Sequence, residues 1–118
     1  MPRPHYLDEG FRKPVNLSEL NRLESLCRTK HPNWTVDRGA SQDGGIVELY
    51  YGAARICDAI CHSGSYGGDE GLLEFWTGRL SDDPQGYLSA EEALALFEKR
   101  MDERTGRAKR SPKTLEEK

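Results

Sequence analysis

The chain has 118 residues, of which 36% are hydrophobic and 31% charged, and its formal net charge at pH 7 is -3. This length predicts one small domain, and the composition is that of a soluble globular protein with a high share of charged residues. No apolar run approaches the roughly 18 residues that a membrane span requires. The opening residues, MPRPHYLDEGFRKP, lack the apolar region of a secretory signal. We therefore expect a cytoplasmic protein without a membrane partner.

The first part of the chain predicts an arm followed by a helix. Residues 1–15 contain three of the six prolines and show no hydrophobic periodicity, so we expect an extended N-terminal arm. A helix is expected over residues 16–29, where leucines recur at helical spacing. Asn16 or Ser18 is expected to cap its first turn. Pro32 is expected to end it, because the residue before a proline avoids the helical conformation.

The middle of the chain predicts an antiparallel sheet. Three runs rich in strand-forming residues, 46–51, 54–62 and 72–77, follow one another with short connections. A fourth run, 34–38, alternates apolar and polar residues and is expected to add one more strand. The segments rich in glycine and turn-forming residues are expected to be loops: 39–45, 63–71 and 78–86.

A second helix is expected to begin at Ser89. Ser89 and Glu92 have the spacing of a capping box, in which each side chain bonds to the other residue's backbone amide. The helix is expected to run to about Glu103, and its predicted buried stripe is Ala90, Ala93, Leu94, Phe97 and Met101. Residues 104–118 have no apolar face and are expected to form a basic, disordered tail. The expected fold class is α+β, with a three- or four-stranded antiparallel sheet, an N-terminal helix and a C-terminal helix in one domain over residues 16–103.

The charge is distributed unevenly along the chain. Residues 103–118 carry six Lys/Arg and three Asp/Glu, whereas the remaining residues carry 11 and 17. An acidic body does not suit nucleic-acid binding through phosphates, but it suits a protein partner with a basic surface. The element order also occurs in double-stranded RNA-binding domains, yet Glu91 and Glu92 stand where that family carries basic residues. The alternative that remains is a nucleic-acid-binding module that uses the basic tail from Arg104 to Lys113.

The stretch SYGGDEGLLEF, residues 65–75, resembles the Gly-Gly-Asp/Glu-Glu-Phe signature of diguanylate cyclases. Gly71 stands where that signature has phenylalanine, and the expected run of consecutive strands differs from the cyclase order. The stretch is also unlike a phosphate-binding loop, because it lacks a lysine and leads into a strand. Asp69 and Glu70 would moreover repel an anion. The sequence therefore predicts a hairpin connection here.

The three cysteines, Cys27, Cys57 and Cys61, are expected to be free thiols, because their number is odd and no secretion signal precedes them. On one face of a strand, Cys57 and Cys61 would lie about 13 Å apart, which is too far for one metal ion, and His62 would point to the other face. We expect buried thiols, no metal site and no cofactor. A small hydrolase or metal enzyme built on these residues is the lesser alternative.

Three carboxylates lie on neighbouring predicted strands. Glu48, Asp58 and Glu74 could line one face of the sheet, but the sequence leaves open whether they do. Such a group serves either as an acid pair in catalysis or, more often, as a solvated sheet surface.

Two segments, 48–75 and 82–99, are similar to a group of short phage and prophage proteins. The shared pattern reads Ile-Cys-x-x-x-x-His at 56–62, Ser-Tyr-Gly-Gly-x-x-Gly-Leu-x-Glu at 65–74, and Gly-Tyr-Leu-Ser/Thr-x-Glu-Glu at 86–92. The resemblance covers a little under half of the chain. It implies a small accessory protein of a mobile element, a class that includes inhibitors of host defence systems such as anti-CRISPR proteins.

Size, acidic body and resemblance together predict a non-enzymatic protein that binds a host protein. The contact surface is expected in the loops 63–71 and 78–87, because exposed aromatic side chains on loops often anchor partners. The expected partner-binding residues are Tyr66, Asp69, Glu70, Asp82, Asp83 and Tyr87. The sequence leaves open whether Tyr66 packs on the core or stands exposed, and it leaves the oligomeric state open.

Overall fold

The computed structural model describes residues 14–106 of the chain. The arm expected over residues 1–15 and the tail expected over residues 104–118 therefore lie almost wholly outside the described part. In chain order the elements are α2 (Ser18–Lys30), β1 (Thr35–Ser41), β2 (Gly44–Tyr51), β3 (Ala54–Cys61), the short 3-10 helix η1 (Gly68–Glu70), β4 (Leu73–Trp76), β5 (Gln85–Leu88) and α3 (Ala90–Thr105).

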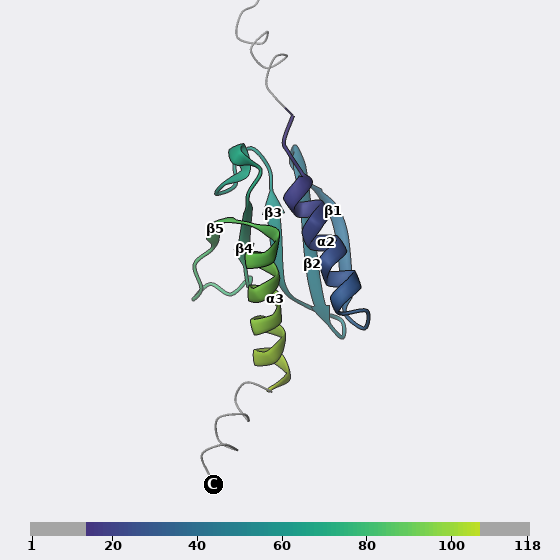
Figure 1. The fold of residues 1–118 in the computed structure, drawn as a ribbon. Coiled ribbons are helices and arrows are strands. Elements are labelled where there is room, and N and C mark those ends of the chain that lie inside the picture. Colours follow the sequence, from purple (N-terminus) through teal and green to yellow (C-terminus); the bar gives the residue numbers. More distant parts are fainter. Residues whose placement is uncertain (1–13, 107–118) are drawn as a thin grey trace, which may run out of the picture.

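The strands form one antiparallel sheet in which each strand pairs with the next one along the chain, in the order β1-β2-β3-β4-β5. Helices α2 and α3 lie side by side on one face of this sheet (Figure 1). The expected α+β class with an N-terminal and a C-terminal helix is confirmed. The sheet has five strands where three or four were expected.

Helix α2 forms where the leucine spacing predicted it. Leu20, Leu23 and Cys27 are fully buried against the sheet and α3. The expected cap at Asn16 or Ser18 is wrong, because Leu17 occupies the N-cap position and its side chain makes no capping bond. Asn16, one residue earlier, accepts with its Oδ1 from the amide of Ser18, the first helical residue, at 3.0 Å and from the Ser18 hydroxyl at 2.7 Å.

The prediction of a loop over residues 39–45 is wrong. β1 continues to Ser41 and β2 begins at Gly44, so only Gln42 and Asp43 form the turn. These residues are weak strand formers, and their pairing with the neighbouring strand overrides that preference. Gly44 permits this pairing, because a Cβ there would lie 1.9 Å from the carbonyl oxygen of Cys61.

The loop expected over residues 78–86 is too long, because β5 begins at Gln85. β5 is a short edge strand whose register against β4 shifts by one residue. Its Tyr87 has φ 61, a conformation that non-glycine residues seldom adopt. A strand with this geometry has no signature in the sequence.

Helix α3 is longer than expected. It runs to Thr105 and includes Arg104, which was expected to begin the disordered tail. Gly106 follows in the left-handed conformation and ends the helix with a glycine cap. The predicted stripe on α3 is buried and completes the core between the helices and the sheet: Ala90, Ala93, Leu94, Phe97 and Met101.

The capping box of α3 generates the first testable prediction. Ser89 Oγ accepts from the Glu92 amide at 3.2 Å, and Glu92 Oε1 accepts from the Ser89 amide at 2.9 Å. Replacing Ser89 by alanine should lower the free energy of unfolding by about 1 kcal/mol, measured by urea denaturation. The matched control is Ser25→Ala on the exposed side of α2, which should stay within about 0.5 kcal/mol of wild type. Equal losses in the two variants would contradict this role of Ser89.

Candidate functional site

The face of the sheet opposite the helices carries a mixed group of charged and apolar side chains. In the register of the sheet, Glu48 lies opposite Asp58, and Asp58 lies opposite Trp76. Ile60 lies opposite Glu74 in the next row. Glu48, Asp58 and Glu74 therefore share one face of the sheet, which the sequence had left open. We call this surface the acidic face, and its members are Ile46, Glu48, Tyr50, Arg55, Asp58, Ile60, Glu74 and Trp76.

A bulge in β3 places Arg55 on the acidic face. Leu49 lies opposite Cys57, but Tyr50 lies opposite Arg55, so Ile56 is an extra residue in β3. Without the extra residue, strand alternation would put Arg55 on the same side as the buried Cys57. The carbonyl of Ile56 is not left unpaired, because it accepts from Arg100 Nε of α3 at 2.9 Å.

Arg55 compensates only part of the negative charge. Its Nη1 donates to Glu48 Oε2 at 2.7 Å and lies 3.9 Å from Asp58 Oδ2. Asp58 is 8% exposed, and within residues 14–106 its carboxylate accepts no hydrogen bond. Burial raises the pKa of Asp58 to about 6; Arg55 opposes this shift, and Glu48 and Glu74 add to it. Asp58 is thus a buried carboxylate with an incomplete set of partners.

Tyr66 and Tyr87 form an exposed pair at the rim of the acidic face. The Tyr66 amide donates to Glu74 Oε1 at 2.7 Å, and the Tyr87 amide donates to the Tyr66 carbonyl at 3.2 Å. Gly86 permits this approach, because a Cβ there would lie 2.2 Å from the Cβ of Tyr66. Their side chains are 57% and 60% exposed. The backbone of Tyr66 is therefore held in place while its ring faces solvent, which answers the question that the sequence left open.

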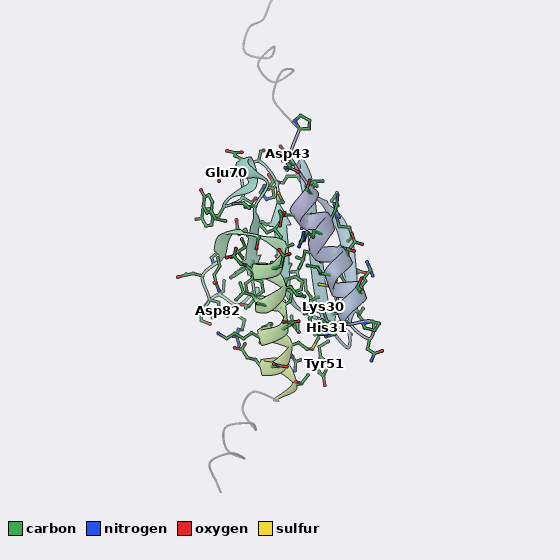
Figure 2. All side chains as sticks on the ribbon, in the orientation of Figure 1. Lys30, His31, Asp43, Tyr51, Glu70 and Asp82 are labelled. Atoms are coloured by element: carbon green, nitrogen blue, oxygen red, sulfur yellow. The ribbon has the colours of Figure 1, made fainter. Side chains whose placement is uncertain are left out.

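The other predicted partner residues do not all gather at this rim. Asp69 and Glu70 are exposed in η1, in the same loop as Tyr66. Figure 2 shows Glu70 at the end of the molecule that also carries Asp43, with Asp82 well away from it. The expected six-residue surface is thus divided between two places.

Asp82 organises its own loop. Its carboxylate accepts from Thr77 Oγ1 at 2.7 Å and from Arg79 Nε at 3.0 Å, and these bonds hold the pKa of Asp82 below its ordinary value. Its backbone carbonyl accepts from the indole Nε1 of Trp76 at 2.8 Å. The Asp82 carbonyl therefore helps to hold the indole of Trp76 in place. The neighbouring Asp83 is exposed.

A cleft at the other end of the molecule is the main rival to the acidic face. It has a volume of about 570 Å³, and its walls include His31, Trp34, Tyr51 and Glu98. His31 stacks on Trp34 with ring centroids 3.8 Å apart, and its Nε2 lies 2.8 Å from Glu98 Oε2. The guanidinium of Arg104 lies 5.3 Å from the centre of the Tyr51 ring. Because these groups already satisfy one another, the acidic face is the stronger candidate.

The thiols have the character of core residues. Cys27, Cys57 and Cys61 are all buried and unpaired. Burial raises the pKa of Cys27 to about 12 and also raises the pKa values of Cys57 and Cys61. A thiol with so high a pKa is protonated at neutral pH and is a poor nucleophile. Within residues 14–106 no three His, Cys, Asp or Glu side chains are arranged to hold a metal ion, and no helix there is long and apolar enough to cross a membrane.

Sequence reasoning missed the roles of Arg55 and Trp76. The period-two pattern of β3 carries no signal for the bulge that turns Arg55 outward. Trp76 was assigned to a strand, but its place beside Asp58 depends on the pairing of β3 with β4. No local pattern could have shown either.

Comparisons of the chain with protein-family models, with curated proteins and with solved structures found no match. The resemblance to phage and prophage proteins therefore stays a prediction.

The raised pKa of Asp58 generates the second prediction. The native state binds this proton more tightly than the unfolded state, so the contribution of Asp58 to stability falls as pH rises from about 4 to about 6. Asp58→Asn should raise the free energy of unfolding at pH 7 by on the order of 1–3 kcal/mol and have little effect at pH 4. Urea denaturation at several pH values measures this, with the exposed Asp83→Asn as the control. A gain that does not depend on pH would contradict this account of Asp58.

The third prediction concerns the thiols. Because all three are buried and their pKa values are raised, the native protein should react with a thiol–disulfide exchange reagent at pH 8 more slowly than the unfolded chain, by on the order of a hundredfold or more. The rate is followed by absorbance, and the same protein in denaturant is the control. A thiol that reacts in the native state at the unfolded rate would revive the thiol-enzyme alternative.

Proposed function

We propose that the chain is a small non-enzymatic accessory protein of the phage or prophage type, which binds a host protein through its acidic face and inhibits a host defence system. One observation carries the binding part of this proposal. The face of the sheet that the helices leave uncovered combines partly exposed apolar side chains with carboxylates that are only partly neutralised.

The apolar part of the acidic face resembles the centre of a protein interface. Ile46, Tyr50, Ile60 and Trp76 are each partly exposed. Ile46 lies opposite Ile60, and Trp76 is the diagonal neighbour of Ile60, whereas Tyr50 lies beyond Glu48, opposite Arg55. Contiguous apolar side chains bordered by polar ones are characteristic of surfaces that bind another protein.

The charge of the molecule supports a basic partner. Residues 14–106 contain nine Lys/Arg and sixteen Asp/Glu, so their formal net charge is -7. On the acidic face itself, Arg55 pairs with Glu48 and lies 3.9 Å from Asp58, and within residues 14–106 Glu74 has no ion pair. Complementary charge increases the rate of association and selects against partners of the same sign. A host protein whose basic surface normally receives nucleic acid has the required charge.

The tyrosine pair extends the acidic face with aromatic anchors. The amide of Tyr66 donates to Glu74, so the backbone of this exposed tyrosine is anchored at the rim of the acidic face. Tyrosines are among the residues that contribute most to binding energy at interfaces. Because the backbone of Tyr66 is already held, little conformational entropy is lost when its ring is covered.

The alternative is nucleic-acid binding by the basic tail. Most of that tail lies outside the described residues, and the part inside, Arg104, packs over the ring of Tyr51. A truncation after Gly106 separates the alternatives: it should abolish a salt-sensitive gel shift under the tail hypothesis and leave protein binding unchanged under the proposed function.

The fourth prediction tests the proposed function with two double variants, each of which removes two negative charges. Glu48→Gln with Glu74→Gln removes two charges from the acidic face and keeps an acceptor for the Tyr66 amide. Glu91→Gln with Glu103→Gln removes two charges from exposed positions of α3. A host protein captured from lysate and then purified should bind wild type and the α3 pair equally, and the face pair at least about tenfold more weakly by titration calorimetry.

Tyr66→Ala gives an independent measure on the same partner. Removing this aromatic anchor should also weaken binding by about tenfold or more. Circular dichroism and thermal denaturation establish that each variant is folded. If the captured protein binds the face pair and Tyr66→Ala as tightly as wild type, the acidic face is not the binding site.

A further inference from the structure

We propose that the acidic face holds one arginine side chain of the partner, seated beside Asp58 and Glu74 and against the ring of Trp76. This inference rests on the proposed function and names the chemistry of the group that the face recognises. We call Asp58, Glu74 and Trp76 the arginine seat. The inference follows from the incomplete bonding of Asp58, from the bond that holds Arg55 to Glu48, and from the positions of the three residues of the seat.

The carboxylate of Asp58 lacks the partners that a buried charge normally has. It is 8% exposed, its only ion pair within residues 14–106 is at 3.9 Å, and it accepts no hydrogen bond from them. Buried polar groups in proteins are hydrogen-bonded in the large majority of cases. A group that remains short of donors in the folded chain is a good acceptor for donors from a partner.

Arg55 meets this need only in part, because its Nη1 lies 3.9 Å from Asp58 Oδ2 and donates instead to Glu48. Its guanidinium donates to Glu48 Oε2 at 2.7 Å, and the bulge at Ile56 fixes Arg55 opposite Tyr50, one row from Asp58. Breaking its bond with Glu48 to reach Asp58 would leave Glu48 without its cation. Arg55 thus bonds Glu48 and only approaches Asp58, and within residues 14–106 Glu74 forms no ion pair.

The positions of Asp58, Glu74 and Trp76 suit a guanidinium. Asp58 lies directly opposite Trp76, and Glu74 lies two residues before Trp76 on the same face of β4. Asp58 and Glu74 are thus diagonal neighbours, with Cα atoms about 7–8 Å apart. A planar guanidinium offers five donors, which suit two separate carboxylates, and it also stacks on aromatic rings. The indole of Trp76 is held by its bond to the Asp82 carbonyl, so the ring is positioned in advance.

A metal ion or a lysine fits this seat less well. A divalent ion at Asp58 would lie against the guanidinium of Arg55, which is 3.9 Å from the same carboxylate. A lysine ammonium is a compact point charge and cannot bond two diagonal carboxylates and cover a ring with one plane. The seat therefore selects for arginine.

The test uses a peptide of alternating arginine and glycine, with matched peptides in which every arginine is replaced by citrulline or by lysine. Citrulline keeps the shape of arginine and removes its charge. The chain has two tryptophans, Trp34 and Trp76, so a ¹⁵N-labelled sample gives two indole signals, which Trp34→Phe assigns. The titration is run at pH 7.5 in about 0.15 M salt, where contacts between distant charges are screened.

The arginine peptide should shift the Trp76 indole signal to saturation and leave that of Trp34 in place. The lysine peptide should bind several-fold more weakly, and the citrulline peptide should give no saturable shift. Asp58→Asn should weaken binding of the arginine peptide by about tenfold or more, because a charge-assisted hydrogen bond is lost. Glu103→Gln, on the helix side of the molecule, should leave it unchanged.

Binding should also weaken as pH falls from 7.5 to 5. The titratable and charged groups that face the seat are Asp37 of β1, Glu48 and Tyr50 of β2, Arg55 and Asp58 of β3, and Glu74 of β4. Among them, Asp58 has a pKa raised to about 6, so it gains its proton within this range. The loss on acidification should be much smaller in Asp58→Asn.

Three results would overturn the arginine seat: no saturable shift of Trp76, equal binding of the arginine and lysine peptides, or unchanged binding by Asp58→Asn. Binding of the captured host protein to the same variants distinguishes failure of the arginine seat from failure of the proposed function. If that protein depends on Glu48 and Glu74 but binds Asp58→Asn as tightly as wild type, the acidic face is the interface and the seat is wrong. If it binds all variants alike, both are wrong.

Discussion

The extra residue in β3 is the constraint on which the open face of the sheet depends. At Ile56 the strand advances by one residue without a partner, and Arg55 passes from the buried side of the sheet to the exposed side. Arg100 of α3 accommodates this by donating to the freed carbonyl of Ile56. A contact in the helix layer thus stabilises the bulge, and the bulge places Arg55 on the opposite face beside Glu48 and Asp58.

The two faces of the sheet differ in burial and in the kind of side chain that they carry. The face beneath α2 and α3 buries the apolar core, and the cysteines there are small hydrophobic residues with raised pKa values. The opposite face receives no helix within residues 14–106, so its strands keep charged and aromatic side chains. Asp58 on this face costs stability when it is ionised. The same incomplete bonding is the basis of the proposed arginine seat.

The glycine-rich loop that resembles a nucleotide-binding signature has a structural explanation. Gly67 and Gly71 adopt φ 93 and 74, conformations that favour glycine, and they bracket the single turn of η1. The loop then returns to the sheet, where Tyr66 is held by Glu74 and Tyr87 through backbone groups. This arrangement fixes the loop and exposes two aromatic rings, so the tyrosine side chains are free to contact a partner.

Local patterns in the sequence determined both helices, the three central strands, the capping box at Ser89 and the buried stripe of α3, because periodicity and capping act between residues close in the chain. Tertiary structure decided the rest. The hairpin over 39–45 and the edge strand β5 form through pairing that overrides weak strand preference. The acidic face depends on register, since a one-residue bulge moves a side chain to the other side of a sheet. Pairing between consecutive strands, together with packing against the helices, sets that register, and no pattern within a single strand encodes it.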